Sequence, residues 1–193
     1  MGSYYYLMAQ LPFLVYEQKP PMSSGAFIAL CKPLISEKDA ALIERLAIEP
    51  DFNASSPTGC AFIDGWREWE RSFALNLAKH RAVKIKRENV LTSEPPPYPQ
   101  DAAVTAAKAV NGDSSPLDAE ILIDKARWSA IDNFAGIDYF GINTVYAYFL
   151  KLLLLERRQA FNVETGFSEY KSLYSEIIKN SQASGYNFSG EPK

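Results

Sequence analysis

The sequence has few of the side chains that carry metal or nucleophilic chemistry. It contains one histidine, His80, and two cysteines, Cys31 and Cys60, among 193 residues. Zinc sites and Ser-His or Cys-His catalysis need more of these groups, or need them in recognisable motifs. The P-loop, G-x-G-x-x-G and G-x-S-x-G patterns are missing as well. We therefore predict no cofactor, no metal and no catalysis by the chain on its own.

An excess of basic charge and a long apolar run are also missing. The formal net charge is -3, which argues against general nucleic-acid binding. The most apolar stretch, Val145 to Leu155, is interrupted by Lys151 and is shorter than the roughly 20 residues of a membrane span. No Lys or Arg precedes the apolar N-terminal stretch, as it would in a signal peptide. We expect a cytoplasmic protein with two buried thiols, either free or peripheral to the inner membrane through a complex.

Hydrophobic periodicity predicts a mainly helical, all-α fold. Ser23 or Ser24, Ser36 and Ser115 stand where helix caps are expected, and Ser115 is followed by proline and then an acid. The segment from Tyr4 to Tyr16 stays open between a short strand and a short helix. Its tyrosine-rich start favours a strand, and Pro12 ends either element. The predicted helices cover roughly residues 23–32, 36–46, 60–86, 101–110, 115–135, 143–161 and 167–180.

Four prolines between Thr92 and Gln100 give the clearest boundary in the chain. Proline blocks helix continuation, so this segment is predicted to be an extended linker. The predicted organisation is an N-terminal helical half over 1–91 that ends in a long tryptophan-containing helix, a linker over 92–100, a C-terminal helical half over 101–180 and a flexible tail over 181–193.

The long helix carries the densest group of candidate interaction residues, Trp66, Arg67 and Trp69. Tryptophan and arginine are enriched where proteins bind one another. The alternative is that both indoles belong to the core face of an amphipathic helix, because an apolar residue recurs at steps of three and four along it. That stripe consists of Phe62, Trp66, Trp69, Phe73 and Leu77. The sequence favours the core interpretation and leaves the contact role open.

The same helix has a basic end, and its residues are the remaining interaction candidates. Positive charge near a helix C-terminus is favourable in itself, so simple solvation is one interpretation. Contact with an acidic partner protein or with anionic lipid headgroups is the other. The residues are Lys79, Arg81, Lys84, Lys86 and Arg87.

One pair of acids needs a separate test. Glu120 and Asp124 lie four residues apart on a predicted helix and share a face, as the acids of a small carboxylate-based enzyme would. However, Asp124 and Arg127 have the spacing of a helical salt bridge. We favour the structural interpretation and keep the enzyme as an alternative hypothesis.

Several stretches together resemble an uncharacterised bacterial family encoded alongside the subunits of V-type rotary ATP synthases. They are the opening from Tyr4 to Pro12, Gly65 to Arg71, Asp118 to Trp128, and Tyr148 to Phe161. The resemblance covers the chain from Tyr4 to about Tyr170. None of these stretches is catalytic, and their order along the chain carries the resemblance.

The resemblance implies an irregular helical bundle similar to the C (or d) subunit of V-type ATPases, an all-helical adaptor. It also implies that the partners are other V-type ATPase subunits. The expected function is that of a non-enzymatic subunit or accessory protein with a coupling or assembly role. A carboxylate-based enzyme and a peripheral membrane-binding helical protein remain the alternatives.

Overall fold

The computed structural model describes residues 4–50, 57–86, 100–112, 115–159, 161 and 163–183. The chain divides into two compact units, Met1–Glu156 (unit 1) and Arg157–Lys193 (unit 2). All regular elements of the described residues are helices, which confirms the predicted all-α class. Unit 1 contains α1 to α6 and most of α7, and unit 2 contains α8. Their bounds are α1 Tyr5–Gln10, α2 Ser24–Cys31, α3 Glu37–Ile43, α4 Ala61–Lys84, α5 Gln100–Asn111, α6 Pro116–Ala135, α7 Ile142–Gln159 and α8 Val163–Ala183.

The strand considered for the N-terminal segment is wrong, because Tyr5–Gln10 is a helix. In a strand, Tyr5 and Leu7 would point to the same side of the chain. Instead Leu7 is buried while Tyr5 and Tyr6 are both exposed. A single helical turn achieves this separation. The tyrosines that favoured a strand in the sequence are exposed residues of this helix.

The predicted serine caps are confirmed at three helices. Ser23 accepts a hydrogen bond from the Ala26 backbone at the start of α2, and Ser36 accepts one from the Asp39 backbone at the start of α3. At α6, Ser115 and Asp118 form a reciprocal capping box, with proline at the first helical position. Each cap satisfies backbone N–H groups that have no partner within the helix. These local signals fix where the helices begin.

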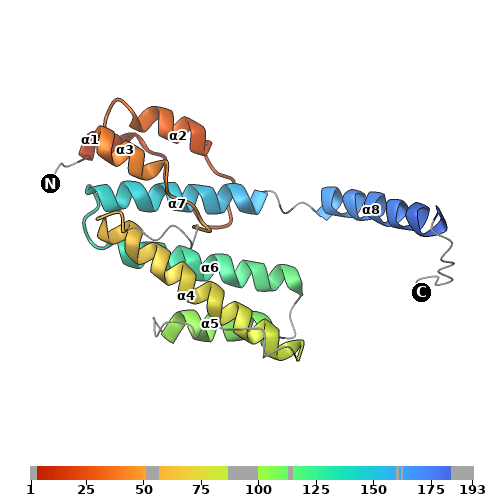
Figure 1. Ribbon diagram of the computed structural model, residues 1–193. Helices are drawn as coiled ribbons and strands as arrows, with labels where there is room; N and C mark the ends of the chain where they lie inside the picture. The colour runs from red at the N-terminus through yellow and green to blue at the C-terminus, as the bar shows by residue number, and fades with distance from the viewer. Residues whose placement is uncertain are drawn as a thin grey trace. The chain divides into compact units, whose positions relative to one another are not determined.

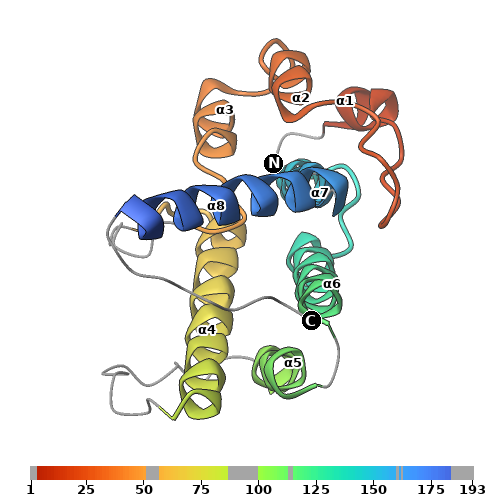
Figure 2. The ribbon, with the colours of Figure 1, turned by 90° about the vertical axis from the view of Figure 1, so that its right-hand side faces the viewer.

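Helix α7 lies at the centre of unit 1, with α1 to α3 on one side and α4 to α6 on the other (Figures 1 and 2). On the first side, Phe27 of α2 stacks on Tyr148 and Phe149 of α7. On the other side, Phe62 of α4 contacts Tyr146 of α7, with ring centroids 5.7 Å apart. This position explains why α7 is apolar nearly all round its circumference.

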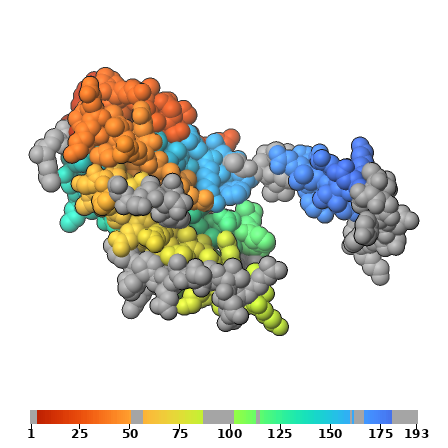
Figure 3. All heavy atoms as spheres, in the orientation of Figure 1, coloured from red at the N-terminus to blue at the C-terminus, as the bar shows by residue number. Residues whose placement is uncertain are grey.

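Helix α4 packs against α5 and α6, and this group forms the second layer of unit 1. The space-filling view shows the segment around α3 directly beside the start of α4 (Figure 3). Of the linker predicted over 92–100, only Gln100 is described, and it already begins α5. In unit 2, α8 begins at Val163 and continues to Ala183, into the segment predicted as a tail. The rest of the linker and of the tail lies outside the described residues.

Candidate interaction surface

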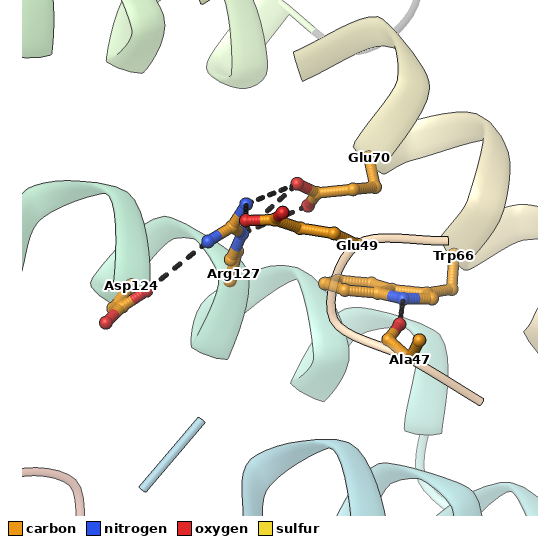
Figure 4. Close-up of polar contacts among 6 residues, drawn as sticks. All are labelled: Ala47, Glu49, Trp66, Glu70, Asp124 and Arg127. Carbon is orange, nitrogen blue, oxygen red and sulfur yellow. Dashed lines mark hydrogen bonds and ion pairs between the residues drawn. The ribbon is translucent and has the colours of Figure 1, made fainter. Parts of the chain in front are cut away.

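A cluster of ionised side chains lies buried between α4 and α6 (Figure 4). The Arg127 guanidinium faces the Glu70 carboxylate, and its Nε lies 3.2 Å from both carboxylate oxygens. On its other side it contacts Asp124, at 3.5 Å, within the same helix. Glu49, from the segment that precedes α4, adds a third carboxylate at 3.6 Å. Arg127, Glu70 and Asp124 are all buried.

The balance of burial and charge keeps this arginine ionised. Burial by itself would lower the pKa of Arg127, but the hydrogen bonds and the charge of Glu70, with Asp124 and Glu49, raise that pKa above its ordinary value. A carboxylate held by a permanent cation is a poor proton donor or acceptor. The predicted salt bridge between Asp124 and Arg127 is confirmed, and the geometry gives the hypothesis of a carboxylate enzyme no support.

A second polar cluster centres on Asp39 of α3. Its carboxylate accepts hydrogen bonds from the hydroxyls of Tyr4, Ser36 and Tyr146, at 2.7, 2.8 and 3.1 Å. Partial burial opposes ionisation, but these three donors outweigh it and hold the pKa of Asp39 below its ordinary value. Because the donors come from the N-terminal segment, α3 and α7, the cluster ties these three parts of unit 1 together. Its role is structural.

The two tryptophans of α4 are core residues, as the favoured interpretation of the sequence predicted, and the alternative that they are surface contacts is wrong. Trp66 is 1% exposed and Trp69 is 2% exposed. Trp66 stacks on Trp69, and Trp69 stacks on Phe73. The Trp66 indole donates a hydrogen bond to the Ala47 carbonyl (Figure 4). All five side chains of the α4 stripe are buried, so no part of it remains for a partner. Arg67, between them, is only partly exposed.

The basic end of α4 lies at the surface. Lys79, Arg81, Lys84 and Lys86 are exposed, and Arg87 lies outside the described residues. The Lys84 ammonium donates a hydrogen bond to the Val110 carbonyl at the end of α5, at 2.7 Å. This contact satisfies a carbonyl at a helix C-terminus and gives Lys84 a structural role. Lys79, Arg81 and Lys86 stay candidates for contact with an acidic surface.

In the described part of the chain, candidate metal ligands do not gather, and one of the two thiols is buried. No group of three or more His, Cys, Asp or Glu side chains in it is placed to hold a metal ion. Burial raises the pKa of the Cys31 thiol to about 11, so this thiol stays protonated at neutral pH. A protonated thiol is a weak nucleophile. Cys60 is also free and is partly exposed.

One open cavity of unit 1 has the character of a binding site, and we call it the N-terminal groove. Its volume is about 410 Å³, within the range of sites that accept small molecules or protruding side chains. Three segments form it: α1 with the residues after it, the connection from α6 to α7, and one side of α7. The apolar and aromatic residues that line it include Met8, Leu11, Phe13, Tyr139, Phe140 and Ala147.

Hydrogen bonds and an ion pair fix the walls of this groove. The Tyr148 hydroxyl donates to the Pro12 carbonyl at 2.8 Å, and the Tyr4 backbone N–H donates to the Phe140 carbonyl at 2.8 Å. Lys151 forms an ion pair with Asp132 and lies over the Trp128 ring. These polar groups satisfy one another, so the groove presents mainly apolar surface. It is a preformed site because three separate segments are held in place.

Large exposed apolar side chains line the groove at Phe13, Tyr139 and Phe140, and Ile137 lies next to the lining residue Gly136 in the chain. Phe13 is 88% exposed and Ile137 is 87% exposed. Tyr139 and Phe140 are exposed as well, and the Phe140 ring contacts the ring of Tyr5, with centroids 4.8 Å apart. Soluble proteins rarely leave such side chains together at the surface unless they bind something. The sequence did not reveal this surface, because its residues come from two segments more than a hundred positions apart.

Fold and site together define an all-α protein with an internally paired cluster of buried charges between α4 and α6 and an open, mainly apolar cavity. A family model described as "Protein of unknown function (DUF2764)" matches residues 67–181. This is more than half of the 193-residue chain, so the chain belongs to the DUF2764 family. This match confirms the predicted membership of an uncharacterised family, and it does not bear on the predicted link to V-type ATP synthases.

The other comparisons give no match: neither a curated protein nor a solved structure resembles the chain significantly. Among the described helices, none combines the length and the apolar character that crossing a membrane requires.

Proposed function

We propose that this protein is a non-enzymatic helical component of a V-type ATPase, acting in coupling or assembly by contact with other subunits. The observation that carries the proposal is the N-terminal groove with its exposed lining residues Phe13, Tyr139 and Phe140. The resemblance of the ordered sequence stretches to a family encoded with V-type ATP synthase subunits supplies the identity of the partners.

The occupant that suits the groove is the apolar face of a helix from a partner subunit. A cavity of about 410 Å³ has room for a few large side chains, and the exposed rim extends the contact area beyond the cavity itself. Interfaces typically concentrate their binding energy in such central, apolar pockets. The ion pair of Lys151 with Asp132 at the groove provides a polar edge.

Affinity purification of the tagged full-length protein from its native host tests the proposal. We expect V-type ATPase subunits to be retained by the unaltered protein and depleted at least about tenfold by Phe13→Asp, as for a hot-spot residue. Val104→Asp is the matched control, because Val104 is an exposed apolar residue of α5 that does not line the groove. Absence of all ATPase subunits from the unaltered sample would contradict the proposal.

A second candidate function rests on the exposed basic end of α4, where Lys79, Arg81 and Lys86 could hold the protein at an anionic membrane surface. Flotation with vesicles containing anionic lipid distinguishes the two candidates. Membrane attachment by this surface predicts binding that weakens as salt increases, and binding that falls when Lys79 and Arg81 are both changed to Gln. A protein that stays with the soluble fraction at low salt would exclude it.

A further inference from the structure

Helix α8 carries a row of large apolar side chains on its surface. They are Phe167, Tyr170, Leu173, Tyr174, Ile177 and Ile178, and Ile177 is 65% exposed. The rings of Tyr170 and Tyr174 stack on each other along the helix, with centroids 6.1 Å apart. A surface helix of this type needs a partner to cover its apolar side.

The spacing of these residues follows a seven-residue repeat. Phe167 and Tyr174 occupy one core position of the repeat (a), and Tyr170 and Ile177 occupy the other (d), at alternating steps of three and four. The positions opposite this seam (b, c and f) are polar in both repeats. They hold Ser168, Glu169, Ser172, Ser175, Glu176 and Lys179. This arrangement is typical of a helix that pairs with another helix along its length.

The two remaining apolar residues indicate what the partner is. Leu173 lies at the flanking position g, and Ile178 lies at the flanking position e of the next repeat. In a parallel, in-register pair, each g residue faces the e residue five positions further along the partner. Leu173 would therefore meet Ile178 of a second copy on both sides of the seam. An antiparallel pair sets e against e, which would leave Ile178 beside Glu164 or Lys171.

We propose that α8 pairs with α8 of a second copy of this chain as a parallel, in-register two-helix interface. The charge of the helix agrees with this partner: three glutamates and two lysines nearly cancel, so two copies repel each other little. A helix that lies on a membrane surface is usually rich in lysine and arginine on its polar side, and α8 is not. The interface uses different residues from the N-terminal groove and does not depend on the proposed function.

The pairing is expected to be concentration-dependent. The helix of 21 residues spans about 31 Å, but its apolar seam from Phe167 to Ile177 fills only two repeats, fewer than the three or four that a stable helix pair usually needs. Two of the four core residues are tyrosines rather than the Leu or Ile that such seams prefer. Dimers are therefore expected to dissociate on dilution.

Sedimentation of the full-length protein over a range of concentrations tests the pairing. The unaltered chain should shift from monomer to dimer as concentration rises, and Ile177→Glu should keep it monomeric throughout. Ser175→Glu is the matched control, because it adds the same charge on the polar side of the same helix, and it should dimerise as the unaltered chain does. A chain that is monomeric at every concentration, or an Ile177→Glu variant that dimerises normally, would overturn the proposal.

A cysteine experiment tests the orientation. In a chain carrying Cys31→Ala and Cys60→Ser, Tyr174→Cys should form an intermolecular disulfide when two thiols lose their protons and two electrons to an added oxidant such as oxidised glutathione. Ser172→Cys, on the outer side of the helix, should stay uncrosslinked. Dimers that fail to crosslink through Tyr174→Cys would refute the parallel register.

The result is separable from that of the proposed function. Phe13→Asp should leave dimerisation unchanged, because Phe13 belongs to the N-terminal groove. A monomeric chain that still retains ATPase subunits would refute the α8 pairing and leave the proposed function standing. A dimer that retains no ATPase subunits would support the α8 pairing and refute the proposed function.

Discussion

Helices α7 and α8 have similar length and both carry large apolar side chains, yet these side chains are buried in α7 and exposed in α8. In α7, nine residues are buried, among them Val145, Leu150 and Leu152. In α8, the aromatic and aliphatic residues from Phe167 to Ile178 are all exposed. Hydrophobic periodicity therefore predicts that a helix has an apolar face, but it does not predict which part of the molecule covers that face. In α7 the cover is the rest of unit 1, and for α8 we propose a second copy.

The largest effect is expected from breaking the charge cluster of unit 1. Arg127→Ala removes the cation that lies between Glu70 and Asp124 and leaves two buried carboxylates without it. Losing one partner of a buried ion pair costs about 3–5 kcal/mol in the free energy of unfolding. Urea unfolding followed by tryptophan fluorescence measures this cost. Arg81→Ala, at an exposed position of α4, should change stability by less than about 0.5 kcal/mol.

A pair of identical substitutions tests the comparison directly. Leu152→Ala in α7 removes a side chain that is 0% exposed, and a loss of about 2–5 kcal/mol is expected. Leu173→Ala in α8 removes one that is 60% exposed, and in dilute solution it should cost less than about 0.5 kcal/mol. Thermal unfolding followed by circular dichroism compares the two. Similar losses for both variants would show that α8 is packed as tightly as α7.

A smaller effect is expected at Asp39, and it should depend on pH. The pKa of Asp39 is lowered in the folded protein, so its ionised form stabilises the fold above the ordinary carboxyl range near pH 4. That contribution is lost as pH falls through the lowered pKa. Asp39→Asn should cost about 1–2 kcal/mol at pH 7, because three hydroxyl donors, of which only that of Tyr146 is buried, lose a charged acceptor.

Unfolding measured between pH 7 and pH 2 checks this expectation. The difference in stability between the unaltered chain and Asp39→Asn should shrink as the solution becomes acidic. Glu37→Gln, an exposed acid on the same helix, should leave the profile nearly unchanged. A difference that is constant with pH would show that the charge of Asp39 contributes nothing.

Local features of this chain were predictable from its sequence, and pairings between distant segments were not. Ser115 and Asp118 identified the start of α6 because capping depends on neighbours three residues apart. The salt bridge of Asp124 with Arg127 was predicted for the same reason. Glu70, the principal partner of Arg127, lies 57 positions away and left no local signal.

The candidate site shows the same limit. The stripe containing Trp66 and Trp69 was found by its period, but only the packing of α4 against α5 and α6 shows that the stripe is buried. The groove around Phe13 and Phe140 is formed by segments that are distant in the sequence and adjacent in the folded chain, so no local sequence motif predicts it. The exposure of α8 was likewise invisible, since its period resembles that of a core helix.

Hydrogen–deuterium exchange of the full-length protein at several concentrations tests most directly whether α8 keeps its apolar face for a second copy. In dilute solution, amides of α4, α6 and α7 should exchange slowly and those of α8 rapidly, because an isolated helix of this length frays readily. As concentration rises, exchange should slow in α8 and stay unchanged in unit 1. Exchange in α8 that is as slow as in α7 in the most dilute sample, or that does not respond to concentration, would contradict the claim.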